Sequence, residues 1–178
     1  MNRLATIVAV GLASVLFGAR ADALQDATAA MLRKDWPTAV RLLEPLARSG
    51  HAVAQWRLAL LYYHGHGVRE SDAAAREWFE KAARQGLAEA QFELANMVIY
   101  GLADVPAGED PARTAAQWYF EAALQGHAQA QYSLGILFLT GSGVQVSADE
   151  ALKWIGRAAL QGHADAIAYM KARPTPAR

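Results

Sequence analysis

The 178-residue sequence contains no cysteine. A disulfide framework, thiol-based catalysis and a zinc site with cysteine ligands are therefore all excluded. Alanine, by contrast, is the most frequent residue and often stands in pairs and triplets. Because alanine is the best helix former and its small side chain lets backbones approach, this composition favours closely packed helices.

The sequence also lacks an excess of charge of either sign. It has 17 basic and 17 acidic residues, and its isoelectric point is about 7.0. A strongly basic surface for nucleic acid and a polybasic membrane anchor are therefore not expected. With 53% hydrophobic and 19% charged residues, the chain has the composition of a globular protein. Its length suits one domain of ordinary size.

The N-terminal segment has the order of a secretory signal peptide. Arg3 precedes a nearly unbroken apolar run from Leu4 to Phe17. Small residues then give an Ala-x-Ala cleavage pattern, so residues 1–23 are predicted to be removed after Ala21 or Ala23. The alternative is an uncleaved anchor, but about 14 apolar residues are short for a span of about 20. We expect an exported protein, periplasmic in a Gram-negative cell, with no stable membrane anchor after cleavage.

A repeat of about 36 residues organises the rest of the chain. The element Ala-x-Ala-Gln begins at Ala52, Ala88 and Ala128, and a weaker copy begins at Ala164. Two further features keep the same register: a tryptophan followed by an alanine pair, at Trp78, Trp118 and Trp154, and a closing glycine, at Gly86, Gly126 and Gly162. One hairpin cannot bury such a face alone, whereas stacked hairpins form a continuous core.

Each repeat is predicted to contain two helices. The first runs from the Ala-x-Ala-Gln element to a glycine that can adopt the left-handed conformation. The second begins at an N-cap residue, namely Ser71, Asp110 or Ser147. Ser147 and Glu150 also have capping-box spacing. The tryptophan and the following alanine share one face of the second helix, so we expect the indole rings in the core.

These signals predict an all-α solenoid of stacked helix-turn-helix repeats with about nine helices, no strands and no linker between domains. The predicted boundaries are an N-terminal hairpin at 24–49, repeats at 50–86, 87–126 and 127–162, a capping helix at 163–173, and a frayed tail at 174–178. The second repeat has four extra residues around Leu102 to Asp110.

The pattern Ala-x-Ala-Gln-x-x-Leu, Gly-x-Gly-Val, Trp-x-x-x-Ala-Ala-x-x-Gly resembles the Sel-one-like repeat family, which is related to the tetratricopeptide repeat. The resemblance implies a right-handed superhelical solenoid that acts as an adaptor between proteins. Exported bacterial members serve envelope, secretion or signalling assemblies. Some cysteine-rich members are described as penicillin-binding or β-lactamase proteins. This chain lacks their paired cysteines, so a hydrolase or binding protein directed at the cell wall or at β-lactams is the disfavoured alternative.

No residue pattern indicates catalysis, a metal site or a cofactor. His64 and His66 form a close pair in a loop, but a closed metal site needs further ligands. Histidines recur after the closing glycines, at His51, His127 and His163. They could titrate together near neutral pH, but we expect each to satisfy backbone groups at a helix start. Glu77 with Glu80, or Glu89 with Glu93, could act as paired carboxylates in acid–base catalysis, but their spacing is that of an ordinary exposed helix face. No phosphate-binding glycine loop, nucleophile elbow or His-Glu-x-x-His motif is present.

Positions that vary between repeats are free to carry partner specificity. On the first helix of each repeat, offsets of four, three and four residues trace one face. We define these positions as the first-helix face: Val53, Arg57, Leu60 and His64; Glu89, Glu93, Asn96 and Tyr100; Gln129, Ser133, Ile136 and Thr140. In relatives of this fold the first helices line the concave groove. Its mixed chemistry suits a protein or peptide partner better than a phosphate backbone. The alternative is an idle, solvated face.

Overall fold

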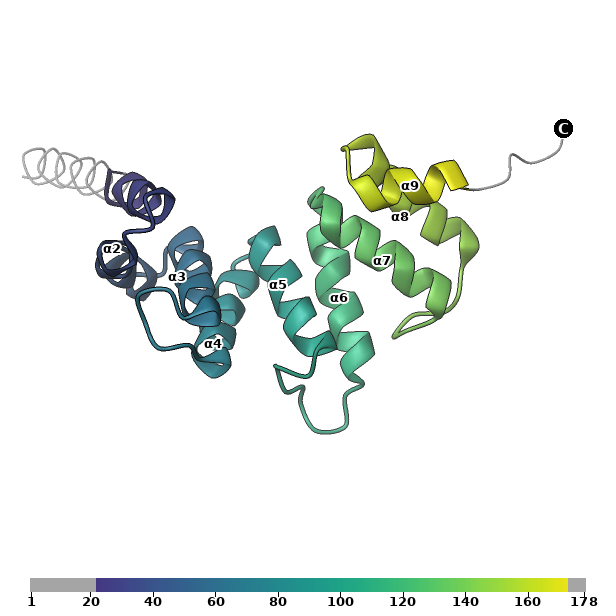
Figure 1. The fold of residues 1–178 in the computed structure, drawn as a ribbon. Helices are drawn as coiled ribbons and strands as arrows, with labels where there is room; N and C mark the ends of the chain where they lie inside the picture. The colour runs from purple at the N-terminus through teal and green to yellow at the C-terminus, as the bar shows by residue number, and fades with distance from the viewer. Residues whose placement is uncertain (1–21, 173–178) are drawn as a thin grey trace, which may run out of the picture. The chain divides into compact units, whose positions relative to one another are not determined.

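The computed structural model describes residues 22–172, and the chain in this range is helical without strands. Residues 22–32 form the first helix, and eight labelled helices follow (Figure 1): α2 (Trp36–Arg48), α3 (Ala52–His64), α4 (Asp72–Arg84), α5 (Ala88–Ile99), α6 (Pro111–Leu124), α7 (Ala128–Thr140), α8 (Ala148–Leu160) and α9 (Ala164–Ala172). The prediction of an all-α repeat fold with nine helices is therefore confirmed for this part of the chain. The signal-peptide prediction falls largely on residues 1–21, and the predicted tail on 174–178; both ranges lie outside the described residues.

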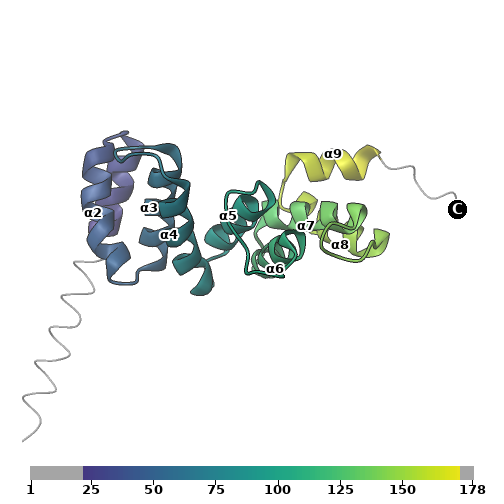
Figure 2. The same cartoon turned by 90° about the horizontal axis from the view of Figure 1, so that it is seen from below.

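The described residues divide into two compact units, the first ending at Ala75 and the second beginning at Arg76, with the boundary inside α4. In the first unit, α2 packs on α3, and the two helices lie side by side in Figure 2. In the second unit, each helix from α5 to α9 packs on the next one along the chain. None of the helices among residues 22–172 combines the length and the apolar character that crossing a bilayer requires.

The second glycine of each Gly-x-Gly loop allows a close crossing of two backbones. Gly67 and Gly143 have φ of +72° and +69°, a range that few side chains adopt. A Cβ on Gly143 would stand 2.2 Å from the carbonyl oxygen of Ala112, at the start of α6. A Cβ on Gly67 would likewise stand 2.8 Å from the backbone of Trp36, at the start of α2. The loop after α3 therefore packs directly on the start of α2, and the loop after α7 packs on the start of α6.

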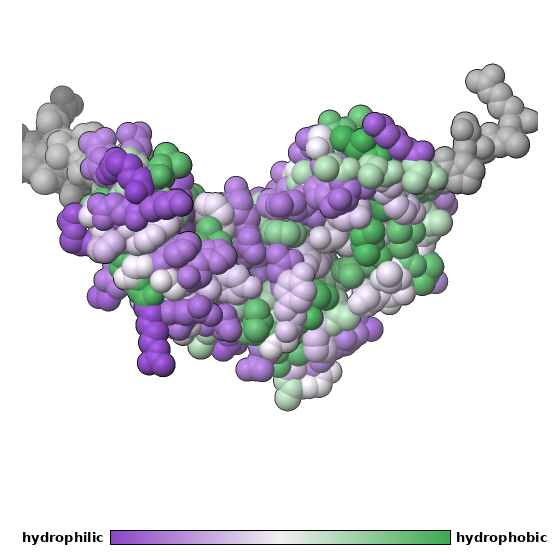
Figure 3. All heavy atoms as spheres, viewed as in Figure 1, coloured by the Kyte–Doolittle hydropathy of each residue, from purple (hydrophilic) through white to green (hydrophobic). Residues whose placement is uncertain are grey.

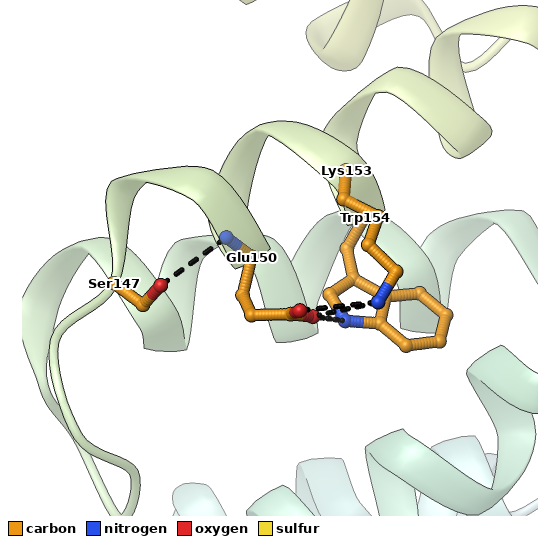
Figure 4. Close-up of polar contacts among 4 residues, drawn as sticks. All are labelled: Ser147, Glu150, Lys153 and Trp154. Atoms are coloured by element: carbon orange, nitrogen blue, oxygen red, sulfur yellow. Dashed lines mark hydrogen bonds and ion pairs between the residues drawn. The ribbon is translucent and has the colours of Figure 1, made fainter.

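The predicted N-caps are confirmed. Ser71, Asp110 and Ser147 accept hydrogen bonds from backbone amides of the first turns of α4, α6 and α8. The capping box at Ser147 is only half formed, and this part of the prediction is wrong. The amide of Ser147 donates to the carbonyl of Phe138 instead. The Glu150 carboxylate accepts from Lys153 Nζ and from Trp154 Nε1, at 3.1 and 3.0 Å (Figure 4).

The expected burial of the three repeat tryptophans is correct only for Trp154, which is 2% exposed. Trp78 and Trp118 are half-buried. In each second helix the residue after the tryptophan is buried: Phe79, Tyr119 and Ile155. The alanine pairs lie in the core with them, as in Ala82, Ala83, Ala122 and Ala123. The centre of the buried stripe thus lies one residue further along than predicted.

The glutamine of the Ala-x-Ala-Gln element is buried in every repeat, and Gln55, Gln91 and Gln131 are each 4% exposed. Its side-chain amide donates to a carbonyl of the preceding second helix: Gln55 to Ala47, Gln91 to Ala83 and Gln131 to Ala123. In the second unit, the side-chain amides of Gln125 and Gln161 also donate to Gln91 Oε1 and Gln131 Oε1. Each such glutamine therefore links its own helix to the second helices on both sides along the chain.

Candidate functional site

The first-helix face is accessible in both units, and none of its predicted residues is buried. His64, Tyr100, Gln129 and Thr140 are exposed, and the other positions are half-buried. Their buried neighbours on the same helices are the repeated residues, such as Ala90, Gln91, Leu94 and Ala95 of α5. The repeat pattern therefore separates packing positions from variable positions as predicted.

Tyr119 of α6 connects the parts of the face that lie on α5 and α7. Its hydroxyl donates to Asn96 Oδ1 at 2.6 Å, and Asn96 Nδ2 donates to Glu93 at 3.3 Å. Burial and the nearby charge of Tyr100 raise the pKa of Tyr119 to about 12, Ser133 on α7 lowers it through a hydrogen bond, and Glu93 raises it. The variable side chains of two successive repeats thus belong to one polar cluster.

The start of α7 is fixed by His127, beside this cluster. The Ala130 amide donates to His127 Nδ1 at 3.2 Å, and the ring stacks on Phe92 of α5 at 4.8 Å between centroids. Burial lowers the pKa of His127, and the Glu89 carboxylate opposes that change. His127 is therefore held as a neutral N-cap, because a protonated Nδ1 cannot accept a hydrogen bond.

His163 repeats this arrangement at α9, where Nδ1 accepts from the Ala166 amide and the ring stacks on Tyr132. The predicted backbone role of the recurring histidines is therefore confirmed for His127 and His163. It is wrong for His51, which precedes α3 without a side-chain cap and whose Nδ1 is buried without a partner.

In the first unit, the face residues have their own contacts. The guanidinium of Arg57 donates to the hydroxyl of Thr28, and burial lowers the pKa of Arg57. His64 lies 5.5 Å from His66 between ring centroids, and His66 stacks on Trp36 at 4.3 Å. No group of three or more histidine, aspartate and glutamate residues that could hold a metal occurs among the described residues.

Sequence reasoning missed Tyr119. The signal that could have found it is that Phe79, Tyr119 and Ile155 occupy one repeat position and only Tyr119 carries a polar atom. A lone hydroxyl at a core position requires a hydrogen-bond partner, which points to a polar cluster next to it.

Comparison with known families agrees with this repeat architecture. The model of the Sel1 repeat matches residues 52–87, 88–127 and 128–163, one or two residues later than the repeat boundaries predicted above. This chain belongs to the Sel1 repeat family. Sel1 repeats are in general protein-interaction modules and are typically non-catalytic scaffolds. The comparison with curated proteins gave no match.

Solved structures of Sel1 repeat proteins share the fold. A Sel1 repeat protein from Oxalobacter formigenes is 32% identical, with a TM-score of 0.75 over 84% of this chain and 58% of that one. The protective antigen c5321 of uropathogenic Escherichia coli, described as having an SLR fold, is also 32% identical, with a TM-score of 0.68 over 78% and 30%. This chain therefore spans less than two thirds of either relative.

Helicobacter pylori cysteine rich protein B is more distant. It is 18% identical, with a TM-score of 0.52 over 81% of this Sel1 repeat chain and 94% of that protein. This likeness shows the fold alone.

Proposed function

We propose that this Sel1 repeat protein is a non-catalytic scaffold that binds a partner polypeptide through its first-helix face. The observation that carries the proposal is the Tyr119 cluster. Tyr119 joins variable residues of α5 and α7 through Asn96 and Ser133, so two repeats present unlike side chains on one ordered surface. Such a surface is pre-organised, which lowers the entropic cost of binding.

The chemistry of the face favours a polypeptide. In the second unit it offers two carboxylates, amides, hydroxyls, an aliphatic side chain and the 72% exposed Tyr100, without lysine or arginine. Hydrophobic side chains also gather around α7 on the side shown in Figure 3. Mixed polar and apolar groups with an exposed aromatic residue are typical of protein interfaces, whereas a phosphate backbone requires basic residues.

Residues 1–23 have the order of a signal peptide, so we propose that the scaffold works in the periplasm or cell envelope. The alternative function, a hydrolase or binding protein directed at the cell wall or at β-lactams, has no support from the described residues. The sequence contains no cysteine, whereas the relatives described with that activity carry paired cysteines.

The test is capture of the partner from the native envelope by the tagged chain, with identification by mass spectrometry. Glu93→Arg and Tyr100→Ala are each expected to weaken binding of the identified partner at least tenfold, about 1.4 kcal/mol. Asp149→Arg makes the same charge change on α8, away from the face, and is expected to bind normally. Full affinity in both face variants, with the melting temperature unchanged, would exclude the first-helix face.

A further inference from the structure

The three repeat tryptophans have different surroundings, although they occupy one position of the repeat. Trp154 is enclosed by its neighbours. Its Nε1 donates to Glu150, and the edge of its ring meets Phe120 at 5.8 Å between centroids. Two cations also stand over the ring, Arg157 at 4.7 Å and Lys153 at 5.6 Å from its centroid. Figure 4 shows the Glu150 carboxylate in contact with both the Trp154 N–H group and the Lys153 ammonium group.

A cation over the indole recurs in the first repeat. The ammonium group of Lys81 stands 4.2 Å from the centroid of the Trp78 ring. Lys81 and Arg157 occupy the same repeat position, three residues after the tryptophan. Ammonium and guanidinium groups are attracted to the negative face of an indole, so this position supplies an internal cation–π partner in both repeats.

The second repeat replaces every one of these partners. Around Trp118, the positions equivalent to Glu150, Lys153 and Arg157 hold Thr114, Gln117 and Glu121. The ring partner from the preceding repeat also differs, because Glu80 occupies the position that corresponds to Phe120. The hydroxyl of Thr114 is hydrogen-bonded to Glu109, and Glu80 forms an ion pair with Arg84 at 2.5 Å. Among the described residues, no cation lies over the ring of Trp118. At the position where its counterparts have a cation, Trp118 has a carboxylate.

Two cavities open where these partners are missing. One has a volume of about 240 Å³ and the other about 610 Å³, and Trp118, Gln117 and Arg84 line both. The smaller cavity has an apolar floor that includes Leu94 and Val98, and it is walled by the longer loop of this repeat through Ala103, Asp104, Val105, Pro106 and Glu109. Glu121 lines the larger one. The four extra residues thus bound an opening beside the half-buried indole.

We propose that Trp118 and Glu121 form a binding site for an arginine or lysine side chain of a partner polypeptide. The partner's cation takes the place over the indole that Lys81 and Arg157 occupy over Trp78 and Trp154. Glu121 supplies the opposite charge, and the apolar floor accepts the residues that flank the cation. Acidic residues outnumber basic ones around the two cavities, with Glu80, Asp104, Glu109 and Glu121 against Arg76 and Arg84. This charge balance fits a cationic segment.

The experiment titrates the intact chain with an acetylated and amidated Gly-Phe-Arg-Gly peptide and follows the five indole N–H signals by nuclear magnetic resonance. A saturable shift of the Trp118 signal alone is expected, with Trp118→Phe providing the assignment. The same peptide with citrulline, a neutral isostere of arginine, is expected to cause no shift. Free arginine amide is expected to bind at least tenfold more weakly than the peptide.

Two variants at one position make the test specific. Glu121→Gln is expected to weaken binding of the arginine peptide at least fivefold. Glu121→Arg restores the internal cation of the other repeats, so it is expected to abolish the shift without lowering the melting temperature. The site is overturned if the citrulline peptide binds equally, if no indole or all five indoles shift, or if Glu121→Arg binds like the wild type. Equal affinity for free arginine amide would overturn its assignment to a polypeptide.

This site is lined by residues of α4, α5, α6 and the loop before α6, and none of the first-helix face residues lines it. Glu93→Arg and Tyr100→Ala are therefore expected to leave the Trp118 shift unchanged. Loss of partner capture in those variants, with an intact Trp118 shift, would show that the two surfaces bind independently. Retained capture in Glu93→Arg and Tyr100→Ala, together with lost capture in Glu121→Arg, would reject the first-helix face while supporting the Trp118 site.

Discussion

Tryptophans at one repeat position differ in burial because of their neighbours in space. Trp154 is buried because Phe120, Glu150 and Arg157 contact its ring or its N–H group. Trp118 has polar or acidic residues at the equivalent positions and is half-buried. The contribution of each indole to stability is therefore set by these surrounding residues.

The matched substitutions Trp154→Ala and Trp118→Ala measure this difference. Truncating the buried Trp154 is expected to lower the free energy of unfolding by about 3–5 kcal/mol, and the loss for Trp118 is expected to be clearly smaller. Thermal or urea unfolding of both variants checks the order. Equal losses would mean that Trp118 is as well packed as Trp154, and the cavities beside it would then be doubtful.

His127 makes the start of α7 sensitive to acid. Because burial lowers its pKa below the usual value of 6.5, the neutral form dominates in both folded and unfolded chains above that pH. As the pH falls below about 6.5, the unfolded chain binds the proton first, so stability is lost until the pH passes the lowered pKa of the folded state. The charged ring would also lie unfavourably at a helix N-terminus.

His127→Asn is expected to keep the cap without the titration, since asparagine is a good N-cap residue. Between pH 7.5 and 5.0 its melting temperature should therefore fall less than that of the wild type. His64→Asn, at the exposed last residue of α3, removes a histidine that caps no helix, so it serves as the control and should fall like the wild type. If His127→Asn loses as much stability in acid as the wild type, the cap does not titrate as described.

At the scale of helices, the buried glutamines hold successive second helices in register. Gln131 donates to the carbonyl of Ala123 on α6, and it accepts from the Gln161 side chain, which follows α8. A buried carbonyl without a donor is costly, so this side chain is required where it stands.

Gln131→Leu keeps a similar volume and removes both hydrogen bonds. The expected loss is about 1–3 kcal/mol in the free energy of unfolding, the cost of leaving a buried polar group unsatisfied. Gln145→Leu, in the exposed loop before α8, is the matched control and should change stability little. Urea unfolding measures both variants, and equal midpoints would contradict the role given to the glutamine.

Helix boundaries could be predicted from the sequence because caps and glycines act locally. Ser71, Asp110 and Ser147 cap where their spacing indicates, and Gly65 and Gly141 end α3 and α7 in the left-handed conformation. Which face of each second helix is buried was harder to predict from the sequence. Trp78 and Trp118 have the size of core residues, but their burial depends on residues of other helices.

The candidate site was predictable to a similar extent. Exposure of the first-helix face follows from the variability of its positions between repeats. The Tyr119 cluster could not be predicted in this way, because Tyr119 contacts Asn96 and Ser133, which are 23 and 14 positions away in the sequence. Only packing of α6 between α5 and α7 brings these groups together.

At the scale of the whole molecule, the proposed export predicts where the mature protein begins. We expect the mature protein to begin at Leu24, or at Asp22 with the alternative cleavage after Ala21. Mass spectrometry of the intact protein from the native envelope checks this directly. A mature protein that keeps Met1 would reject cleavage, and recovery only in the cytosolic fraction would reject export.

The central claim is that the first-helix face contacts a partner polypeptide. A photo-crosslinking amino acid placed at Asn96 or Ser133 in the native host tests it most directly, with Arg48 on α2 and Asp149 on α8 as control positions. The account predicts that one partner polypeptide is crosslinked from both face positions and from neither control. Crosslinks from the controls alone, with none from Asn96 and Ser133, would contradict it.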